Sequence, residues 1–355
     1  MTVEPTLNNV VVSCKGGENT SLEIRNPPVP GSGEILLKLR AVGFCGTDLF
    51  KLTTNSALPG TVLGHEMVGQ VIALGEEVNK FSLGDRLVVP HHVPCGYCLL
   101  CRRGNETMCD VFKENLMEPG AFANLILIRA RAVEQAAFLI PENLSDESAV
   151  FMEPAACVLR GINRAEQTDD GSVVIIGAGS MGLLHLLVLK AALPEVTVIV
   201  IDPLEDRCAL AKKLGADHAI APGKNAHSII KAATNDIGVD TVFDTVGGSK
   251  TMKEGISLTR RGGSIVLFAH APENEQAGVT INSIFKFERR ILGTYSGSVK
   301  EQSEIFELLV NGDLDPSPLV THTMPLSEFR HGLELVKNQQ ALKVIFTPVD
   351  MKEIL

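Results

Sequence analysis

The stretch "SVVIIGAGSMGLLHLLVLKAALPEVTVIVID", Ser172 to Asp202, decides the architecture of this 355-residue chain. Its apolar runs are continuous, as in strands buried on both faces of a sheet. Gly177, Pro194 and Glu195 interrupt these runs at intervals that suit a strand, a turn, a helix and a second strand. A transmembrane helix needs a longer uninterrupted apolar run, so a membrane span is not expected. The stretch predicts the beginning of a parallel sheet.

Strand and helix patterns continue to alternate after Asp202. The predicted helices are 205–215, 226–234 and 249–259, and the predicted strands are 217–220, 239–247, 263–269 and 290–295. Strands that alternate with helices of this length are typical of a doubly wound parallel sheet. The fold class predicted for this part of the chain is therefore α/β.

The chain before about Leu144 shows a different pattern of predicted elements. Short strand patterns at 34–44, 66–78 and 84–89 are separated by loops rich in Gly and Pro. After about Gly297 the remaining patterns are too few to form a domain, so we expect them to complete the β-rich part. The predicted division is 1–155 for the β-rich domain, 156–296 for the parallel-sheet domain, and 297–355 for the return segment.

The net charge of −10 argues against nucleic acid as a partner. Without a Lys/Arg stripe to neutralise phosphates, nucleic acid is not an expected partner. The first residues, "MTVEPTLNNVVVSC", show no basic region followed by a long apolar run, so no signal peptide is expected. We expect a soluble cytoplasmic protein, whose cysteines would be reduced thiols.

The motif "GAGSMG" fits a dinucleotide-binding turn between a strand and a helix. In such a turn the first glycine permits the tight bend, the second lets the backbone approach a pyrophosphate, and the third lets the helix pack closely on the strand. The helix N-terminus offers free N–H groups to the phosphates. The predicted cofactor contacts from this motif are Gly177, Gly179, Ser180, Met181 and Gly182.

Asp202 ends the next predicted strand, 202 − 182 = 20 positions after the last glycine of the motif. A carboxylate at this place accepts hydrogen bonds from ribose hydroxyls and repels a 2′-phosphate, so NAD is predicted in preference to NADP. A solvated strand end or a helix cap is the alternative role for Asp202. Arg207 is predicted to contact the adenosine side of the cofactor.

The loop "PCGYCLLCRRGNETMCD" carries Cys95, Cys98, Cys101 and Cys109. The first three match the start of a ferredoxin pattern, but seven residues then precede Cys109, where that pattern has three. Disulfides are not expected in the cytoplasm. Four thiolates around one ion leave no open position for a substrate. The loop therefore predicts a structural zinc, with an iron–sulfur electron-transfer protein as the alternative of another class.

Other candidate ligands are scattered. "GFCGTD" contains Cys45, "GHE" contains His65 and Glu66, and "FMEPAAC" contains Glu153. A thiolate, an imidazole and a carboxylate are the ligand types of a catalytic zinc, which keeps one position open. Each residue taken alone has an ordinary structural explanation.

Taken together and in this order, "GFCGTD", "GHE", the cysteine loop, "EPAA" and "GAGSMG" resemble the zinc-dependent medium-chain dehydrogenase/reductase family, on its sorbitol (polyol) dehydrogenase branch. The resemblance covers essentially the whole chain. It implies a GroES-like β-rich domain and a Rossmann domain. It also implies catalytic-zinc ligands and neighbours as follows: Cys45, His65 and Glu153 as ligands, Glu66 as a fourth ligand or a neighbour that exchanges with water, Asp48 orienting His65, and Thr47 receiving the proton of the substrate.

The resemblance implies an NAD-dependent dehydrogenase of a secondary alcohol, a polyol or sugar alcohol, with two zinc ions per subunit. The partners would be a small alcohol or ketone and further copies of the chain in a homodimer or homotetramer. L-threonine 3-dehydrogenase, sugar-alcohol-phosphate dehydrogenase and cyclitol dehydrogenase stay open as alternatives. Two positions depart from the family pattern: Phe50 replaces a proton-relay histidine, and Arg160 replaces another histidine. A surface salt bridge is expected for Arg160, with contact to an acidic or polar substrate as the alternative.

Overall fold

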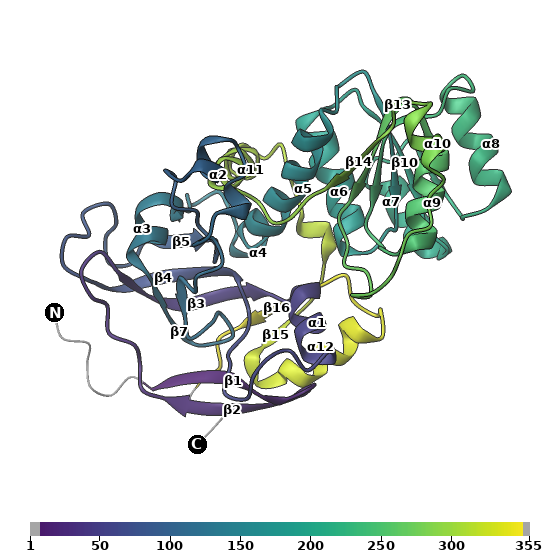
Figure 1. Ribbon diagram of the computed structural model, residues 1–355. Coiled ribbons are helices and arrows are strands. Elements are labelled where there is room, and N and C mark those ends of the chain that lie inside the picture. Colours follow the sequence, from purple (N-terminus) through teal and green to yellow (C-terminus); the bar gives the residue numbers. More distant parts are fainter. Residues whose placement is uncertain (1–7, 351–355) are drawn as a thin grey trace. The chain divides into compact units, whose positions relative to one another are not determined.

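The computed structural model describes residues 8–350, which form two compact units (Figure 1). One unit is the continuous stretch Pro154–Gly297, called here the parallel-sheet unit. The other, called the β-rich unit, combines the chain before Pro154 with the chain from Ser298 onward. The boundary falls inside helix α5 (Met152–Ala165). The predicted α/β fold class, with a β-rich part and a doubly wound parallel sheet, is confirmed.

The parallel-sheet unit has the strand order β11-β10-β9-β12-β13-β14, and all neighbouring strands pair in parallel. The order reverses between β9 and β12, and at such a point the carboxyl ends of the strands open a crevice for a ligand. The elements are β9 (Ser172–Ile176), α6 (Ser180–Ala192), β10 (Thr197–Ile201), α7 (Glu205–Lys213), β11 (His218–Ile220), α8 (Lys224–Ala233), β12 (Val239–Asp244), α9 (Ser249–Leu258), β13 (Thr259–Leu267), α10 (Ile281–Phe285) and β14 (Arg290–Gly293).

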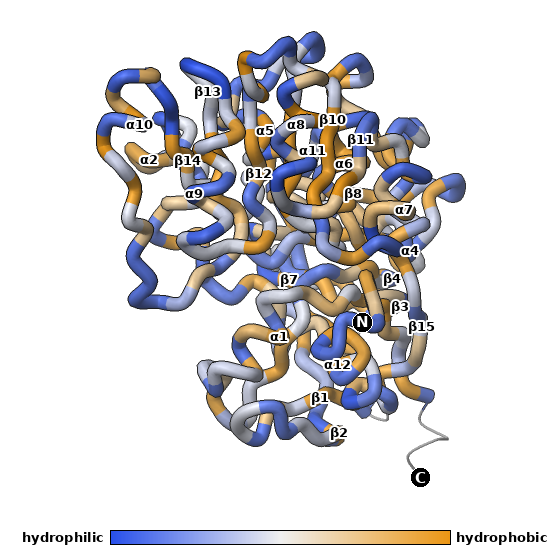
Figure 2. The backbone as a smooth tube through the Cα atoms, turned by 90° about the vertical axis from the view of Figure 1, so that its right-hand side faces the viewer, coloured by the Kyte–Doolittle hydropathy of each residue, from blue (hydrophilic) through white to orange (hydrophobic). Residues whose placement is uncertain are grey.

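Helices cover both faces of this sheet. On one face Ile230 of α8 and Ile256 of α9 pack in a cluster with Val174 and other buried strand residues. On the opposite face the ring of His185 in α6 lies 5.1 Å from the ring of Phe243 in β12. Burial on both faces explains the uninterrupted apolar character of β10, which is orange in Figure 2.

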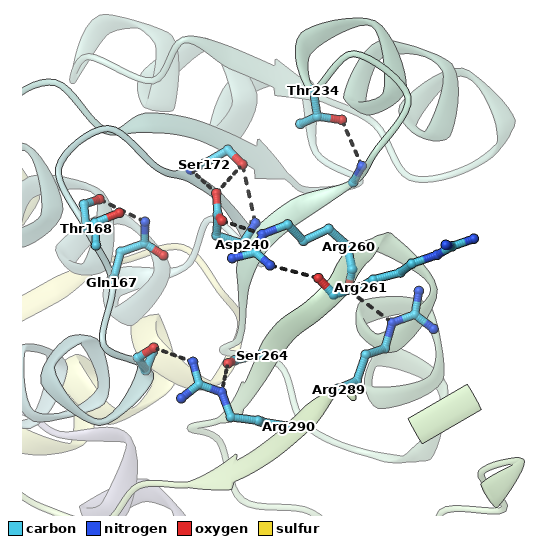
Figure 3. Close-up of polar contacts among 12 residues, drawn as sticks. Gln167, Thr168, Ser172, Thr234, Asp240, Arg260, Arg261, Ser264, Arg289 and Arg290 are labelled. Carbon is cyan, nitrogen blue, oxygen red and sulfur yellow. Dashed lines mark hydrogen bonds and ion pairs between the residues drawn. The ribbon is translucent and has the colours of Figure 1, made fainter. Parts of the chain in front are cut away.

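The amino ends of the parallel strands are tied together by a polar network, shown in Figure 3. The carboxylate of Asp240 in β12 accepts hydrogen bonds from the N–H (2.7 Å) and hydroxyl (2.9 Å) of Ser172 in β9. It also accepts one from Nε of Arg260 in β13, at 2.6 Å. One carboxylate therefore joins three strands at the end of the sheet opposite the glycine turn.

The β-rich unit contains a mixed sheet with the strand order β15-β16-β3-β4-β5-β8, in which β7 also pairs with β3. Strand β16 is antiparallel to β3 and parallel to β15, so the chain after Ser298 extends the sheet of the N-terminal part. The elements are β1 (Asn9–Gly16), β2 (Asn19–Arg25), β3 (Ile35–Gly43), α1 (Gly46–Thr53), β4 (Glu66–Leu74), β5 (Arg86–Val89), α2 (Leu99–Arg102), β6 (Met117–Glu118), β7 (Leu125–Ile128), α3 (Ala130–Ala136), β8 (Phe138–Leu139), α4 (Asp146–Ala149), α11 (Val299–Asn311), β15 (Val320–Pro325), α12 (Phe329–Lys337) and β16 (Lys343–Thr347).

Residues from distant parts of the sequence fill the core of the β-rich unit. The rings of Phe44, Phe122, Phe329 and Phe346 lie within 6.3 Å of one another, centre to centre. This aromatic cluster joins both halves of the unit and supports the start of α1.

Within residues 8–350, no helix has the length and apolar character that a membrane crossing requires.

Arg160 corrects one expectation from the sequence. Its side chain lies in α5 and the residue is only 4% exposed, so the predicted surface position is wrong. From Phe151 to Ile162 every position is buried except Cys157, which is half-buried, so the surroundings of α5 cover a long side chain that the sequence alone would place at the surface.

Candidate functional site

Cys45, His65 and Glu66 meet at one end of the sheet in the β-rich unit. Their sulfur, nitrogen and oxygen ligand atoms all lie within 4.8 Å of one another. The pairing of Gly43 in β3 with Glu66 in β4 brings the two chain segments together, and Cys45 then caps the N-terminus of α1. His65 is 8% exposed and Glu66 is 1% exposed. The group therefore has the ligand types and spacing that a zinc ion accepts.

Asp48 is placed to orient His65. The carboxylate is fully buried, and its Oδ1 lies 3.5 Å from Nδ1 of His65. The N–H groups of Cys45 and Gly64 donate to it at 3.2 and 3.3 Å. Burial would raise the pKa of Asp48, but the neighbouring imidazole and these N–H groups hold it below its usual value. With Nδ1 turned toward Asp48, Nε2 of His65 is left for a metal.

Glu66 has a buried partner that the sequence did not predict. Nζ of Lys343, in β16, lies 2.5 Å from Glu66 Oε2, and Lys343 is 3% exposed. Burial would lower the pKa of Lys343, but Glu66, Cys45 and other acidic groups raise it, so the lysine stays charged.

The other oxygen of Glu66, Oε1, is buried and has no hydrogen-bond partner within residues 8–350. A buried carboxylate oxygen without a donor is unfavourable unless a ligand satisfies it. A metal ion shared with Cys45 and His65 would satisfy it, so the residues of this group fit a zinc ion.

Glu153 lies near the group but outside its 4.8 Å spacing. It is 7% exposed at the start of α5, and its Oε1 is 4.0 Å from Nδ1 of His91. His91 was not among the predicted residues, although the pair "HH" directly before the cysteine loop is a signal for it. The ring of His91 lies 4.4 Å from the ring of His65. Both residues therefore border the group without belonging to it.

The first turn of α1 carries the remaining predicted catalytic residue. Thr47 is half-buried, and its N–H donates to Cys45 Sγ at 3.4 Å. Phe50, one turn later, is 42% exposed. The phenyl ring of Phe50 can neither accept nor release a proton, so a relay that starts at Thr47 needs water or another group for its next step.

The four cysteines of the loop 95–109 also converge, with all four sulfurs within 4.8 Å. The sulfurs of Cys98 and Cys101 are 3.4 Å apart, and those of Cys95 and Cys101 are 3.9 Å apart. Both distances are too long for a disulfide. They lie close to the spacing of about 3.8 Å between sulfurs that surround zinc tetrahedrally at 2.3 Å. The loop therefore fits a closed metal site.

Backbone N–H groups favour thiolates in this loop. Those of Cys98 and Cys101 donate to the sulfurs of Cys95 and Cys98 at 3.4 and 3.5 Å. Burial alone would raise the pKa of Cys95, but nearby N–H groups and thiols lower it to about 6. Burial and the neighbouring sulfurs raise the pKa of Cys101 to about 12, so Cys95 is the first of the two to become a thiolate. Thiolates are the form of cysteine that binds metals.

In the parallel-sheet unit, the glycine turn has the geometry expected for each of its glycines. Gly177 has a φ of +101°, which disfavours a side chain. A Cβ on Gly182 would come within 1.9 Å of the carbonyl oxygen of Gly177. Beside Gly179, by contrast, no heavy atom of the described chain lies within 4 Å of a built Cβ. The backbone at Gly179 is therefore open to an approaching phosphate.

Ser180 and Met181 begin α6 directly after this turn, and both are half-buried. The hydroxyl oxygen of Ser180 is buried and unpartnered within the part of the chain that the structure covers. A polar atom in this condition at a helix N-terminus fits an anionic ligand.

Asp202 follows β10 and is 8% exposed. One oxygen accepts the N–H of Ala178 in the glycine turn at 2.7 Å, and the other accepts the N–H of Leu204 at 2.9 Å. Each carboxylate oxygen has a second lone pair, so these bonds leave capacity for ribose hydroxyls. Arg207 lies half-buried in the first turn of α7. Asp202 thus fixes the glycine turn through Ala178 and caps the start of the next segment through Leu204.

Two protein-family models match the chain. The alcohol dehydrogenase GroES-like domain matches residues 31–139, which include Cys45, His65 and the cysteine loop. The zinc-binding dehydrogenase model matches residues 180–311, most of the parallel-sheet unit. Together they cover both units of the structure.

Similar proteins span the full chain. A sorbitol dehydrogenase of Bacillus subtilis (strain 168) is 32% identical over 92% of this chain and 94% of the relative. An L-threonine 3-dehydrogenase of Caldanaerobacter subterraneus subsp. tengcongensis is 30% identical over 96% and 99%. The solved structure of alcohol dehydrogenase TADH from Thermus sp. ATN1 has a TM-score of 0.85 at 29% identity, covering 96% of this chain and 100% of that one.

Proposed function

Because the chain belongs to the zinc-type alcohol dehydrogenases of the medium-chain dehydrogenase/reductase family, on the sorbitol dehydrogenase-like branch, we propose that it oxidises a secondary alcohol, a polyol or sugar alcohol, with NAD as the oxidant. The observation that carries this proposal is the buried group of Cys45, His65 and Glu66, in which one carboxylate oxygen lacks a partner. A buried carboxylate oxygen without a partner costs stability, and a metal ion that binds to it removes this cost.

The proposed ligands of the catalytic zinc are Cys45, His65 and a carboxylate from Glu66 or Glu153. Zinc bound there supplies Lewis acidity, which makes a substrate hydroxyl acidic and polarises a carbonyl. Asp48 holds the tautomer of His65, and Lys343 holds the second oxygen of Glu66.

The proton and the hydride leave the substrate separately. Thr47 accepts the hydroxyl proton, which then passes to water because Phe50 cannot carry it. Bound NAD⁺ would accept the hydride of the substrate carbon, so that alcohol and NAD⁺ would become ketone, NADH and one proton. Gly177, Gly179, Ser180, Met181 and Gly182 bind the pyrophosphate, and Asp202 and Arg207 bind the adenosine half.

Asp202 is the reason for proposing NAD over NADP, since its carboxylate repels a 2′-phosphate. The cysteines of the loop 95–109 are proposed to hold a second, structural zinc, which gives two zinc ions per subunit. A homodimer or homotetramer in the cytoplasm completes the proposal. Reduced thiols are a requirement of both zinc sites, and the cytoplasm keeps them so.

L-threonine 3-dehydrogenase is the second candidate activity. It is supported by the 30% identical relative of that name, whose length the chain covers almost completely. Sugar-alcohol-phosphate and cyclitol dehydrogenases would use the same metal group. An iron–sulfur electron-transfer protein is disfavoured by the spacing before Cys109.

A substrate panel tests the proposal. Zinc-loaded protein is mixed with NAD⁺ and a series of polyols, cyclitols, sugar-alcohol phosphates and L-threonine, and NADH formation is followed by absorbance. We expect turnover with one or more polyols and a ratio of two zinc ions per chain. Absence of NAD⁺ reduction across the panel, in protein that contains both zinc ions, would refute the proposed function.

A further inference from the structure

Four side-chain rings form a continuous row between the two candidate metal groups of the β-rich unit. The ring of His65 lies 4.4 Å from that of His91, His91 lies 3.6 Å from His92, and His92 lies 5.1 Å from Phe112, all measured between ring centres. His65 belongs to the Cys45 group, and Phe112 packs against the cysteines of the loop 95–109. We call these four side chains the ring row.

The strand register explains why the row begins at His65. Met67 in β4 pairs with Val89 in β5, and His65 and His91 each lie two residues beyond this pair. The side chains of such positions meet on the same face of an antiparallel pair. Val93, which is fully buried in the main core, fixes the backbone immediately after His92.

The cysteine loop fixes the other end of the row. Phe112 is fully buried, and its ring packs with Cys101 and Cys109. Its N–H donates to the carbonyl oxygen of Cys109 at 2.9 Å. The position of Phe112 therefore depends on the four cysteines being gathered together.

His65 has reason to need this support. Its contact with Asp48 is 3.5 Å, the long end of hydrogen-bond range, so the carboxylate alone restrains the ring weakly. The ring of His91, tilted by 43° at a centre distance of 4.4 Å, limits the rotation of the His65 ring. Hydrogen-bonded partners of a metal ligand alter metal affinity about 10- to 100-fold when removed, and a ring held by packing is expected to contribute less.

We propose that His92 and Phe112 are positioning residues that couple the cysteine loop to the Cys45 group. When the loop is closed around its ion, Phe112 and His92 hold His91 against His65, and the imidazole keeps its metal-binding orientation. When the loop opens, the row loosens and the Cys45 group binds its metal less tightly. The inference rests on the proposed zinc sites, and it makes the occupancy of one site a determinant of the affinity of the other.

The test measures zinc release from the purified holoenzyme to an excess of a chromogenic chelator. A Cys45→Ser variant, which lacks one site, identifies the kinetic phase that belongs to the Cys45 group. We expect His92→Ala and Phe112→Ala to speed that phase about three- to tenfold, the size of a lost aromatic contact. His92→Phe, which keeps a ring in the row, should restore the wild-type rate. Tyr97→Ala, on the exposed surface of the same loop, is the matched control and should change nothing.

A double variant separates coupling from local damage. If the two residues act in one row, His92→Ala combined with Phe112→Ala releases zinc no faster than the quicker single variant, whereas independent effects multiply. Wild-type release in His92→Ala, or multiplied effects in the double variant, would overturn the inference. Should Phe112→Ala fail to fold, the pair His92→Ala and His92→Phe decides. Wild-type protein that binds no zinc at the Cys45 group would instead overturn the proposed function.

Discussion

In the parallel-sheet unit the candidate cofactor residues all lie between Gly177 and Arg207, on the turn after β9, on α6, directly after β10 and in the first turn of α7. In the β-rich unit the candidate metal ligands come from the cap of α1 and the start of β4, and their buried cation comes from β16. The first site is assembled by local geometry alone. The second exists only when β3, β4 and β16 are paired in register.

The two sites also differ in how they manage charge. The glycine turn presents backbone N–H groups and open space, and its one buried carboxylate, Asp202, is satisfied by N–H donors. The Cys45 group instead buries whole charges, with Glu66 against Lys343 and Asp48 against His65. Removing one member of a buried charged pair leaves the other uncompensated. We call the Cys45 group the distributed site, because its residues come from distant parts of the chain, and the glycine turn with Asp202 the local site. We expect substitutions in the distributed site to have larger effects than substitutions in the local site.

The largest expected effect is that of Cys45→Ser. Serine supplies no thiolate, so the group loses its softest ligand and we expect kcat/KM to fall about 1000-fold, or about 4 kcal/mol of transition-state stabilisation. Turnover and zinc content are measured together, with Cys208→Ser as a control of the same chemistry in the other unit. Wild-type turnover by a protein lacking Cys45 would place the metal elsewhere.

Lys343→Met tests the buried ion pair. The methionine fills the space of the lysine stem but leaves Glu66 buried without a cation, so we expect the metal-free protein to lose about 3–5 kcal/mol of unfolding free energy. Metal should recover part of this loss, because it gives the carboxylate a new partner. Denaturant unfolding with and without zinc measures both quantities. Lys343→Arg, which keeps the charge, should be much milder, and an equal loss in both variants would point to packing rather than charge.

Cys101→Ser probes the cysteine loop. Because a closed metal site contributes its binding energy to folding, we expect a loss of about 3 kcal/mol in the stability of the zinc-loaded protein. Thermal unfolding and zinc content are the measurements. The turnover of the folded fraction should fall only slightly, because the ring row is expected to change zinc affinity at the Cys45 group by no more than about three- to tenfold. A stable variant with one zinc fewer and no turnover would contradict a mainly structural role for the loop.

Asp202→Ser addresses the local site. Without the carboxylate the repulsion of a 2′-phosphate disappears, and we expect the ratio of kcat/KM for NAD to that for NADP to fall about tenfold. Serine keeps a short polar side chain after β10, which limits disturbance of the turn. Steady-state kinetics with both cofactors decide the matter, and an unchanged ratio would argue that Asp202 serves the turn alone.

Asp240→Asn gives the smallest expected effect, because Asp240 lies at the end of the parallel sheet opposite the glycine turn. Burial would raise the pKa of Asp240, but Arg260 and Ser172 lower it below its usual value of 3.8. A lowered pKa stabilises the folded state above about pH 4, and this stabilisation is lost as the pH falls through that range. We expect the variant to be about 1 kcal/mol less stable at pH 7, with the difference shrinking below pH 4. Urea unfolding across pH 3–7 measures it, and a difference independent of pH would contradict the assignment to charge.

The local site is the part that the sequence predicted best. The helix expected after the glycine turn is observed as Ser180–Ala192, and Gly177 and Gly182 show the steric constraints expected of them. The four cysteines likewise lie in one loop, and their spacing alone indicated a common ion. In both cases the residues that interact are close in sequence, so their pattern carries the geometry.

The distributed site could be predicted only in its ligand types. Lys343 is separated from Glu66 by 277 positions, and nothing in "ALKVIF" states which carboxylate it will meet. His91 meets His65 through the register of β4 and β5, which the sequence does not specify. The burial of Arg160 was missed for the same reason, since exposure depends on what packs over a helix. Only the resemblance to a family connected Cys45 with His65 in advance.

The pairing of β16 with β3 has a consequence for synthesis on the ribosome. The whole parallel-sheet unit is translated between Glu66 and Lys343, and all its strands are contiguous, so it can reach its native fold while the earlier sheet is still open. Until β16 emerges, the end of β3 at Val42 and Gly43 lacks a neighbour on one side, because β7 pairs only with the start of that strand, and Glu66 lacks its buried cation. A nascent chain that stalls near Gly297 would therefore carry a finished nucleotide-binding unit beside an aggregation-prone strand edge, a substrate for chaperones rather than an enzyme.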